Sequence, residues 1–186
     1  MAPEARPGAG GEVETRRYGS LEQRADGRFQ LRFTRTLGHP VDRVWQVVTE
    51  PDQLARWFPT TIEGERVAGA ALRFTFPGGE APPFDGEMLA CDPPSLLEFR
   101  WGPDVMRLEL RPVPHGTELT LLHTLDERGK GARDAAGWHT CLDALARALR
   151  GDDAARTSMS TWAEVHPWYV AHFGPEAATI GPPEGF

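Results

Sequence analysis

GWHTCLDALARALRG, residues 137–151, carries the clearest helical pattern in this chain of 186 residues. Apolar side chains recur at helical spacing along one face: Trp138, Cys141, Leu142, Leu145, Ala148 and Leu149. The other side holds His139, Asp143, Arg147 and Arg150, with Asp143 and Arg147 at the four-residue spacing of an ion pair. Gly151 suits the left-handed position that ends a helix. Such a helix, about 25 Å long, needs an equally long apolar surface to cover it.

That surface is predicted to be an antiparallel sheet. In RFQLRFTRTLGH, residues 28–39, strict alternation places four apolar side chains on one face: Phe29, Leu31, Phe33 and Leu37. Between residues 61 and 126, six short apolar segments are separated by turn signals such as PGGE, WGPD and PVPHG. We therefore expect an α+β fold in which a curved sheet of seven strands wraps around the long C-terminal helix.

Two short helices are expected after the first strand. The first presents a narrow apolar stripe, Val41, Val44, Trp45 and Val48, after Pro40 in its first turn. Thr49 is the expected N-cap of the second helix, with Pro51 in its first turn. The second helix has the apolar side Leu54, Trp57 and Phe58, and it should end at Pro59.

The rest of the chain is predicted to be less regular. Residues 1–27 lack periodicity and are expected to be a flexible arm, while residues 28–151 form the domain, with the hydrophilic DERGKGARD as a loop before the long helix. Residues 152–186 are an extension that contains Trp162, Trp168, Tyr169 and Phe173. We expect a short aromatic helix near 160–173, docked on the domain or on a partner subunit, followed by a mobile end.

Composition excludes several classes of partner. With 20 basic and 27 acidic residues the net charge is -7, which does not favour nucleic acid or an anionic membrane. No apolar run matches a signal peptide or a membrane span, so a cytoplasmic protein is expected. Cys91 and Cys141 both lie in apolar segments and are predicted to be reduced, buried thiols. The single lysine and the absence of asparagine indicate a GC-rich, bacterial-type genome.

The order of these segments resembles a known superfamily. HPVDRVWQVVTEPDQLARWF, LLEFRWG, GTELTLLHTL and GWHTCLDALARAL are together similar to the SRPBCC (START/birch-allergen-like, helix-grip) superfamily, and within it to homologues of the activator of the heat-shock-protein-90 ATPase. The resemblance covers residues 28–151, and its matched positions are Trp57, Phe58, His123, Gly137, Trp138, Leu142 and Leu145. It implies a cavity between sheet and long helix that takes an apolar or amphipathic small molecule. Some superfamily members are cyclases, aromatases or hydrolases.

A set of side chains is predicted either to line that cavity or to form the core. The set is Trp57, Phe58, Phe74, Phe76, Phe99, Trp101, Met106, Leu108, His123, Trp138 and Leu142. His123, on the apolar side of its strand, could bond a ligand carbonyl or act as a general base, which makes it the candidate catalytic residue. The alternative is a core histidine that bridges strand and helix. Trp138 either lines the cavity or sets the angle of the helix.

Strong catalytic signatures are absent from the sequence. There is no P-loop, no G-x-S-x-G and no H-E-x-x-H, and His166 and His172 are six residues apart, so neither cofactor nor metal is expected. Asp85 and Glu87 have no specific spacing to His123, and Arg100 and Arg107 fall on the wet face of their strands.

Three functions remain open. The favoured one is binding of a small hydrophobic molecule without a reaction. The others are a cyclase-, aromatase- or hydrolase-like enzyme that uses His123, and a co-chaperone-like interaction through residues 162–173. The eukaryotic co-chaperone has a second domain for which this chain has no room, which weakens the last hypothesis. A homodimer through the sheet edge or the extension is compatible with the family.

Overall fold

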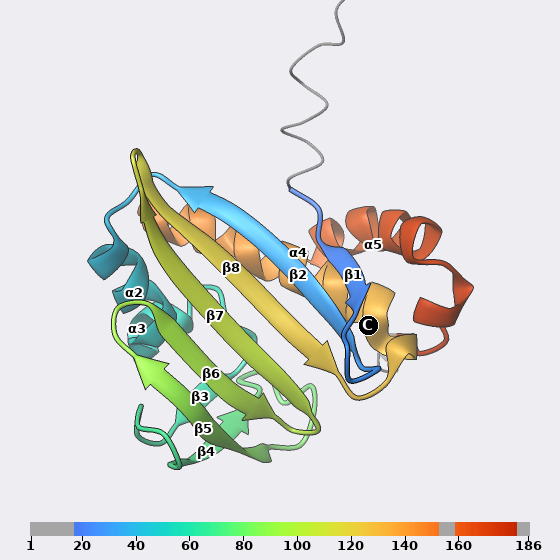
Figure 1. Cartoon of the computed structure of the whole chain (residues 1–186), viewed down its shortest axis with the longest axis horizontal. Coiled ribbons are helices and arrows are strands. Elements are labelled where there is room, and N and C mark those ends of the chain that lie inside the picture. The colour runs from blue at the N-terminus through green and yellow to red at the C-terminus, as the bar shows by residue number, and fades with distance from the viewer. Residues whose placement is uncertain (1–16, 153–158, 182–186) are drawn as a thin grey trace, which may run out of the picture.

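A single antiparallel, unclosed sheet forms one layer of the structure, a computed structural model that describes residues 17–152 and 159–181 (Figure 1). Its strands are β1 (Ser20–Gln23), β2 (Phe29–Leu37), β3 (Thr61–Glu63), β4 (Ala71–Thr75), β5 (Phe84–Asp92), β6 (Leu96–Trp101), β7 (Asp104–Val113) and β8 (Gly116–Leu125). They lie in the order β1-β2-β8-β7-β6-β5-β4-β3. Two strands that are distant in the sequence, β2 and β8, are therefore neighbours in the sheet.

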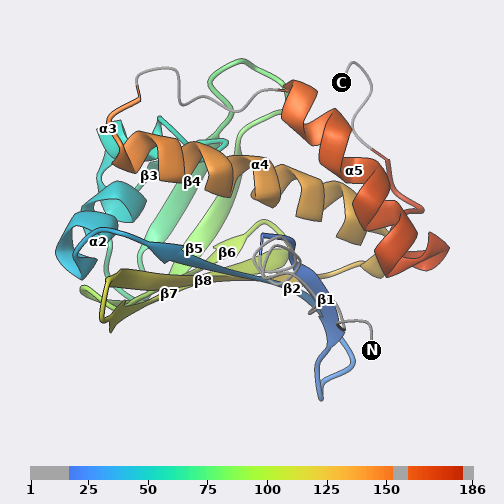
Figure 2. The same ribbon diagram turned by 90° about the horizontal axis from the view of Figure 1, so that it is seen from above.

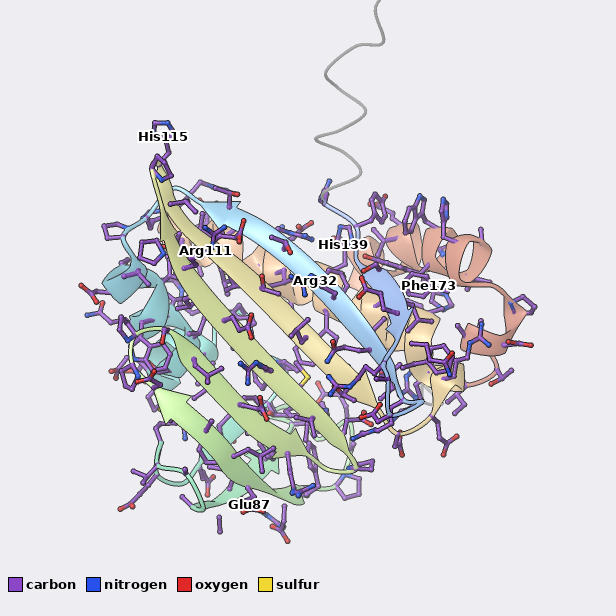
Figure 3. The ribbon with its side chains drawn as sticks, viewed as in Figure 1. Arg32, Glu87, Arg111, His115, His139 and Phe173 are labelled. Carbon is purple, nitrogen blue, oxygen red and sulfur yellow. The ribbon has the colours of Figure 1, made fainter. Side chains whose placement is uncertain are left out.

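The register of these strands gives the sheet an apolar and a polar face. Leu31 lies opposite His123 and Phe33 opposite Leu121, and all four side chains are buried. The intervening Arg32 is exposed, as is Arg111 on β7, and both project from the face turned away from the long helix (Figure 3). The alternation that predicts one wet face is confirmed.

Strand β1 corrects the prediction of seven strands, because the described residues contain eight. Ser20–Gln23 lies in the expected flexible arm, and its sequence SLEQ has no apolar alternation. It pairs with the edge of β2, and the backbone N–H of Gly19 donates to the Tyr169 hydroxyl at 3.1 Å. Gly19 is required there, since a Cβ at this position would lie 2.5 Å from the Phe33 ring. Residues 1–16 of the expected arm lie outside the described residues.

The second layer is the long helix α4 (Gly131–Leu149), which lies across the concave face of the sheet (Figure 2). It begins six residues before the stretch that predicted it, so the expected DERGKGARD loop is partly the short helix η1 (Arg128–Lys130) and the first turn of α4. The early turns of α4 bury only small side chains, among them Ala132, Ala135 and Ala136. These residues allow close packing but give no visible apolar stripe. Gly151 has the expected positive φ, 84°.

A further helix, α5 (Met159–Phe173), packs against α4, and the short helix η2 (Pro175–Ala177) follows it (Figure 2). Because Tyr169 of α5 and Tyr18, which precedes β1, pack against its ring, His139 is 0% exposed, which contradicts its expected solvent-facing position. Asp143 pairs with Arg17 instead of the predicted Arg147. Residues 174–181 are described with η2, whereas residues 182–186 of the expected mobile end lie outside the described part.

The two short helices are α2 (Val41–Thr49) and α3 (Pro51–Leu54), and they close one end of the concave face. The predicted N-cap is wrong: Glu50 occupies the N-cap position of α3, and the Thr49 hydroxyl donates to the Trp45 carbonyl at 2.7 Å. The expected end at Pro59 is also wrong, because α3 ends at Leu54, and Trp57 and Phe58 lie in the turn and bend that follow it. The indole of Trp57 donates to the Val47 carbonyl at 2.9 Å and joins this segment to α2. Among the described residues, no helix combines the length and apolarity needed to cross a membrane.

Candidate ligand site

Seven rings from the sheet, from the residues after α3 and from α4 form an aromatic cluster: Trp57, Phe58, Phe74, Phe84, Phe99, Trp101 and Trp138. The Phe58 ring lies at its centre, with centroids 5.3 Å from Trp101 and 5.5 Å from Trp138. The Phe58–Trp101 pair is edge-to-face, which is a favourable ring packing. The cluster is contributed by the residues that follow α3, by the three strands β4, β5 and β6, and by α4.

The structure places the predicted lining residues in this cluster or next to it. Met106, Leu108 and Leu142 are buried beside the rings, and Phe76 is half-buried against Phe84 at the open end. Most of the predicted set therefore packs side chain against side chain in the core. Phe58 differs, because it also lines a pocket.

This pocket has a volume of about 1110 Å³ and lies between α2, α3, β3 and the end of β5; we name it the α2–β3 pocket. It is lined by Trp45, Thr49, Glu50, Pro51, Leu54, Ala55, Phe58, Thr60, Thr61, Ile62, Glu63, Gly64, Arg66, Pro77, Cys91 and Pro93. Of the predicted lining residues, Phe58 is the one that this wall contains. The Phe58 ring thus belongs both to the aromatic cluster and to the pocket wall.

The wall of the pocket is apolar with a few polar groups. Trp45 and Leu54 were expected only as the apolar sides of the two helices, and Cys91 only as a buried thiol. Cys91 is half-buried, and burial raises the pKa of its thiol, while Arg66 lowers it. Thr60 and Arg66 carried no signal in the sequence, since neither belongs to a motif or a periodic pattern. Their position in the wall follows from the path of the chain after α3.

His123 lies away from this pocket, in a buried polar network. The indole N–H of Trp138 donates to Nδ1 of His123 at 2.9 Å. Because Nδ1 accepts that bond, the ring proton lies on Nε2, which is 2.9 Å from the Asp104 carboxylate. Both ring nitrogens are therefore engaged, as in a core histidine that bridges strand and helix.

Asp104 collects charge-assisted hydrogen bonds at the start of β7. Lys130 Nζ lies 3.0 and 2.8 Å from its two oxygens, and the Asp126 backbone N–H donates to it at 2.7 Å. Burial opposes ionisation, but the bonds from His123, Lys130 and Asp126 hold the pKa of Asp104 well below its usual range. The carboxylate is thus ionised in the folded protein.

Potential metal ligands meet once among the described residues, where donor atoms of Asp104, His123 and Asp134 lie within 4.8 Å of one another. The Lys130 ammonium already occupies the cation position beside Asp104, and Asp134 pairs with Arg133 at 2.6 Å. These residues do not fit a metal, because Lys130 and Arg133 already balance the negative charges of Asp104 and Asp134.

The remaining polar candidates lie apart from His123. Arg100 pairs with Glu87 at 3.4 Å, Asp85 pairs with Arg73 at 2.7 Å, and Arg107 pairs with Glu109 at 2.6 Å. All of these pairs lie on the polar face of the sheet, where Figure 3 labels Glu87. The structure therefore does not bring Asp85 or Glu87 together with His123.

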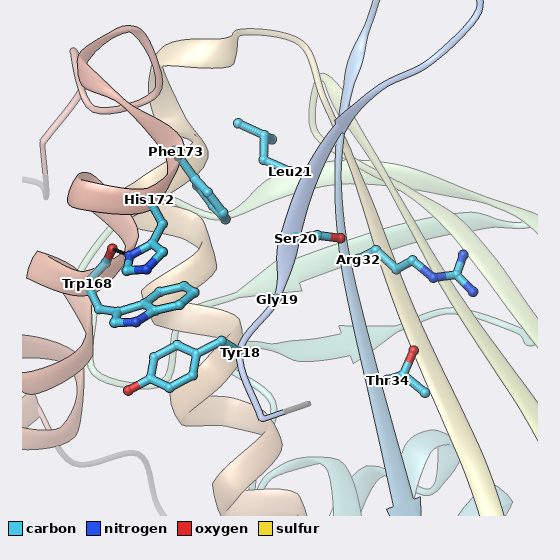
Figure 4. A pocket seen from close by; sticks show the side chains of 9 residues that line it. All are labelled: Tyr18, Gly19, Ser20, Leu21, Arg32, Thr34, Trp168, His172 and Phe173. Carbon is cyan, nitrogen blue, oxygen red and sulfur yellow. Dashed lines mark hydrogen bonds between the residues drawn. The ribbon is translucent and has the colours of Figure 1, made fainter. Parts of the chain in front are cut away.

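A second, shallower hollow of about 510 Å³ lies between β1, β2 and α5 (Figure 4). Its α5 side is a stack in which Trp168 lies 3.9 Å from Tyr18 and 3.6 Å from His172 between ring centroids. His172 Nδ1 is bonded to the Trp168 carbonyl at 2.7 Å, so the ring is held along the helix. His166 stacks on Trp162 instead, and the two histidines do not meet as metal ligands.

The curved sheet gripping a long C-terminal helix defines a helix-grip protein of the SRPBCC superfamily. The chain belongs to the family of Activator of Hsp90 ATPase homolog 1-like proteins, whose model matches residues 38–150. This assignment confirms the resemblance seen in the sequence. A search of curated proteins finds no match to the chain.

Solved structures support the same fold. CalU16 from Micromonospora echinospora is 24% identical with a TM-score of 0.65, over 83% of this chain and 95% of that one. A protein encoded by gene BPP1335 of Bordetella parapertussis is 30% identical with a TM-score of 0.61, over 75% and 84%. DynU16, from the dynemicin biosynthetic locus, is 30% identical with a TM-score of 0.61, over 68% of this chain and 49% of its own length.

Proposed function

We propose that this protein binds a small apolar or amphipathic molecule in the α2–β3 pocket. The observation that carries the proposal is the pocket itself, with its volume of about 1110 Å³ and its contact to the aromatic cluster through Phe58. Binding sites for small molecules are commonly concave and mainly apolar, with a few polar groups that fix orientation. The similarity to DynU16, a protein in a biosynthetic locus, supports a small-molecule ligand.

The arrangement around His123 supports binding over catalysis. A general base needs a ring nitrogen within hydrogen-bond reach of the substrate. In this protein Trp138 and Asp104 engage both nitrogens, and His123 is not part of the pocket wall. The aromatic cluster then supports the pocket wall through Phe58, which belongs to both.

A neutral fluorescent probe, N-phenyl-naphthylamine, tests the proposal in the full chain. Ala55 lines the pocket and is exposed, so Ala55→Trp fills the pocket without disturbing the core. The matched control is Ala171→Trp, at an exposed position on α5 outside the pocket. We expect saturable binding with one site, weakened about tenfold or more by Ala55→Trp, which corresponds to about 1.4 kcal/mol. Absent binding, or equal effects of the two variants, would contradict the proposal.

A further inference from the structure

Two hydrogen-bond donors in the wall of the α2–β3 pocket lack partners among the described residues. Thr60 is 1% exposed, and its Oγ1 makes no hydrogen bond. The Nε of Arg66 is also buried and unpartnered, whereas its two terminal nitrogens donate to the carbonyls of Gly64 at 2.9 Å and Ile62 at 3.2 Å. The guanidinium is thus oriented by the backbone, and its buried Nε–H remains unpartnered.

Unpaired donors of this kind need a physical reason. More than nine in ten buried polar groups in native proteins have a partner, because an unpaired one loses its hydration without compensation. Thr60 and Arg66 line the same pocket, which is the space from which a partner can approach them. A molecule bound in the pocket can supply the acceptors that these donors lack.

Charge in the pocket selects the kind of acceptor. Glu50 and Glu63 also line the pocket, so its one guanidinium is accompanied by two carboxylates. Burial lowers the pKa of Arg66, and the negative charge of Glu50 opposes this shift. A ligand carboxylate would be repelled by Glu50 and Glu63, whereas a neutral oxygen with two lone pairs would not.

We infer that Thr60 and Arg66 recognise a neutral carbonyl oxygen on the bound molecule, whose apolar body contacts Phe58 and Leu54. This inference rests on the proposed function and names the chemical class of its ligand. A ketone or ester oxygen can accept one hydrogen bond from the Thr60 hydroxyl and one from the Arg66 Nε–H. The hydrocarbon part is then buried on the side of the pocket that backs on the aromatic cluster.

Three probes of similar shape test the inference on the full chain by titration calorimetry. They are methyl naphthyl ketone, its hydrocarbon counterpart ethylnaphthalene, and naphthoate, which carries a carboxylate. We expect the ketone to bind about tenfold more tightly than the hydrocarbon, as one to two added hydrogen bonds allow. We expect naphthoate to bind more weakly than the ketone.

The variant Thr60→Val removes the unpaired hydroxyl at nearly constant shape, and Thr60→Ser retains the hydroxyl as the matched control. In Thr60→Val the preference for ketone over hydrocarbon should shrink by at least threefold, while the melting temperature without probe stays equal to or above that of the parent. In Thr60→Ser the preference should remain. A melting scan of each variant shows whether it is folded.

The outcomes separate this inference from the proposed function. Equal binding of ketone and hydrocarbon, both weakened by Ala55→Trp, leaves the pocket as a ligand site but overturns recognition of a carbonyl. A ketone preference that Thr60→Val does not change also overturns the inference, and so does tightest binding by naphthoate. If none of the probes binds, or if Ala55→Trp changes none of them, the proposed function itself fails.

Discussion

The indole N–H of Trp138 donates a hydrogen bond to Nδ1 of His123 across 2.9 Å, and this bond joins α4 to β8. It determines which His123 nitrogen carries the proton and directs the other toward Asp104. Two of the residues that the family resemblance matches are therefore partners in the core. Their contact positions the long helix on the sheet. The proposed ligand site is the α2–β3 pocket, whose wall contains neither residue.

Trp138→Phe should destabilise the protein, because the ring is retained but Nδ1 of buried His123 loses its donor. We expect the free energy of unfolding to fall by about 1–3 kcal/mol, the usual effect of leaving a buried polar atom unpaired. Urea denaturation measures the change. Trp101→Phe is the matched control, since no hydrogen bond of the Trp101 indole occurs among the described residues; equal losses in both variants would contradict the assigned role.

Stability should decrease on acidification because of His139. Burial lowers the pKa of His139 to about 4 from 6.5, although Asp143 opposes the shift; Tyr18, Tyr169, Arg17 and Arg35 also face the ring. Since the unfolded state takes up the proton first, the stability contribution is complete above pH 6.5 and is lost as the pH falls toward 4. The pKa of Asp104 is also lowered, so its contribution to stability is lost only when the pH falls below the usual pKa of a carboxyl group.

The urea midpoint of the parent and of His139→Gln, followed between about pH 7.5 and about pH 4.5, checks this dependence. The glutamine side chain can still accept from Tyr169 but does not titrate in this range. We expect a shallower decrease in the variant than in the parent. Parallel curves would assign the dependence to other groups, such as His166, whose pKa burial also lowers.

Tyr169→Phe should loosen the contact between β1, α4 and α5. The hydroxyl accepts from the Gly19 N–H at 3.1 Å and lies 2.9 Å from Nδ1 of His139, so its removal leaves both groups unpaired. We expect a loss of about 1–3 kcal/mol and faster amide exchange at Ser20–Gln23. The Tyr18→Phe variant is the control, and similar exchange in both variants would argue against this role of the hydroxyl.

The two thiols should differ in reactivity toward a disulfide reagent. Cys141 is buried, and burial raises its pKa to about 12, whereas Cys91 is half-buried and lines the α2–β3 pocket. We expect one thiol to react in the folded protein and two in denaturant, with none reacting in folded Cys91→Ser. N-phenyl-naphthylamine should slow the reaction of Cys91; an unchanged rate with bound probe would place the probe elsewhere.

Periodicity in the sequence was sufficient for the layers of the fold. The stripe from Trp138 to Leu149 predicted the long helix, and the alternation in residues 28–39 predicted β2, because each pattern reflects one face buried against an apolar layer. β1 gave no such signal. Its four residues pair with β2, and the preceding Gly19 bonds to Tyr169 of α5, which is 150 residues away in the chain.

The candidate site was less accessible to sequence reasoning. Phe58 was predicted to line a ligand site, and it does line the pocket, but rings such as Phe74 and Phe99 carry the same apolar pattern and pack in the core. The residue type cannot distinguish a side chain that lines a pocket from one in the core, since both are large and apolar. Thr60 and Arg66 stand out only once their hydrogen-bond partners can be counted.

The amino-acid sequence by itself determined the α+β class and the inward position of His123, because these depend on spacing within single helices and strands. The family followed from the order of the segments along the chain. Only the tertiary structure decided that His139 is buried, that both nitrogens of His123 are engaged, and that a pocket lies beside Phe58. Those properties arise where separate elements meet, and the curvature of the sheet and the angle of α4 set which side chains touch. Local patterns carry no information on those distances.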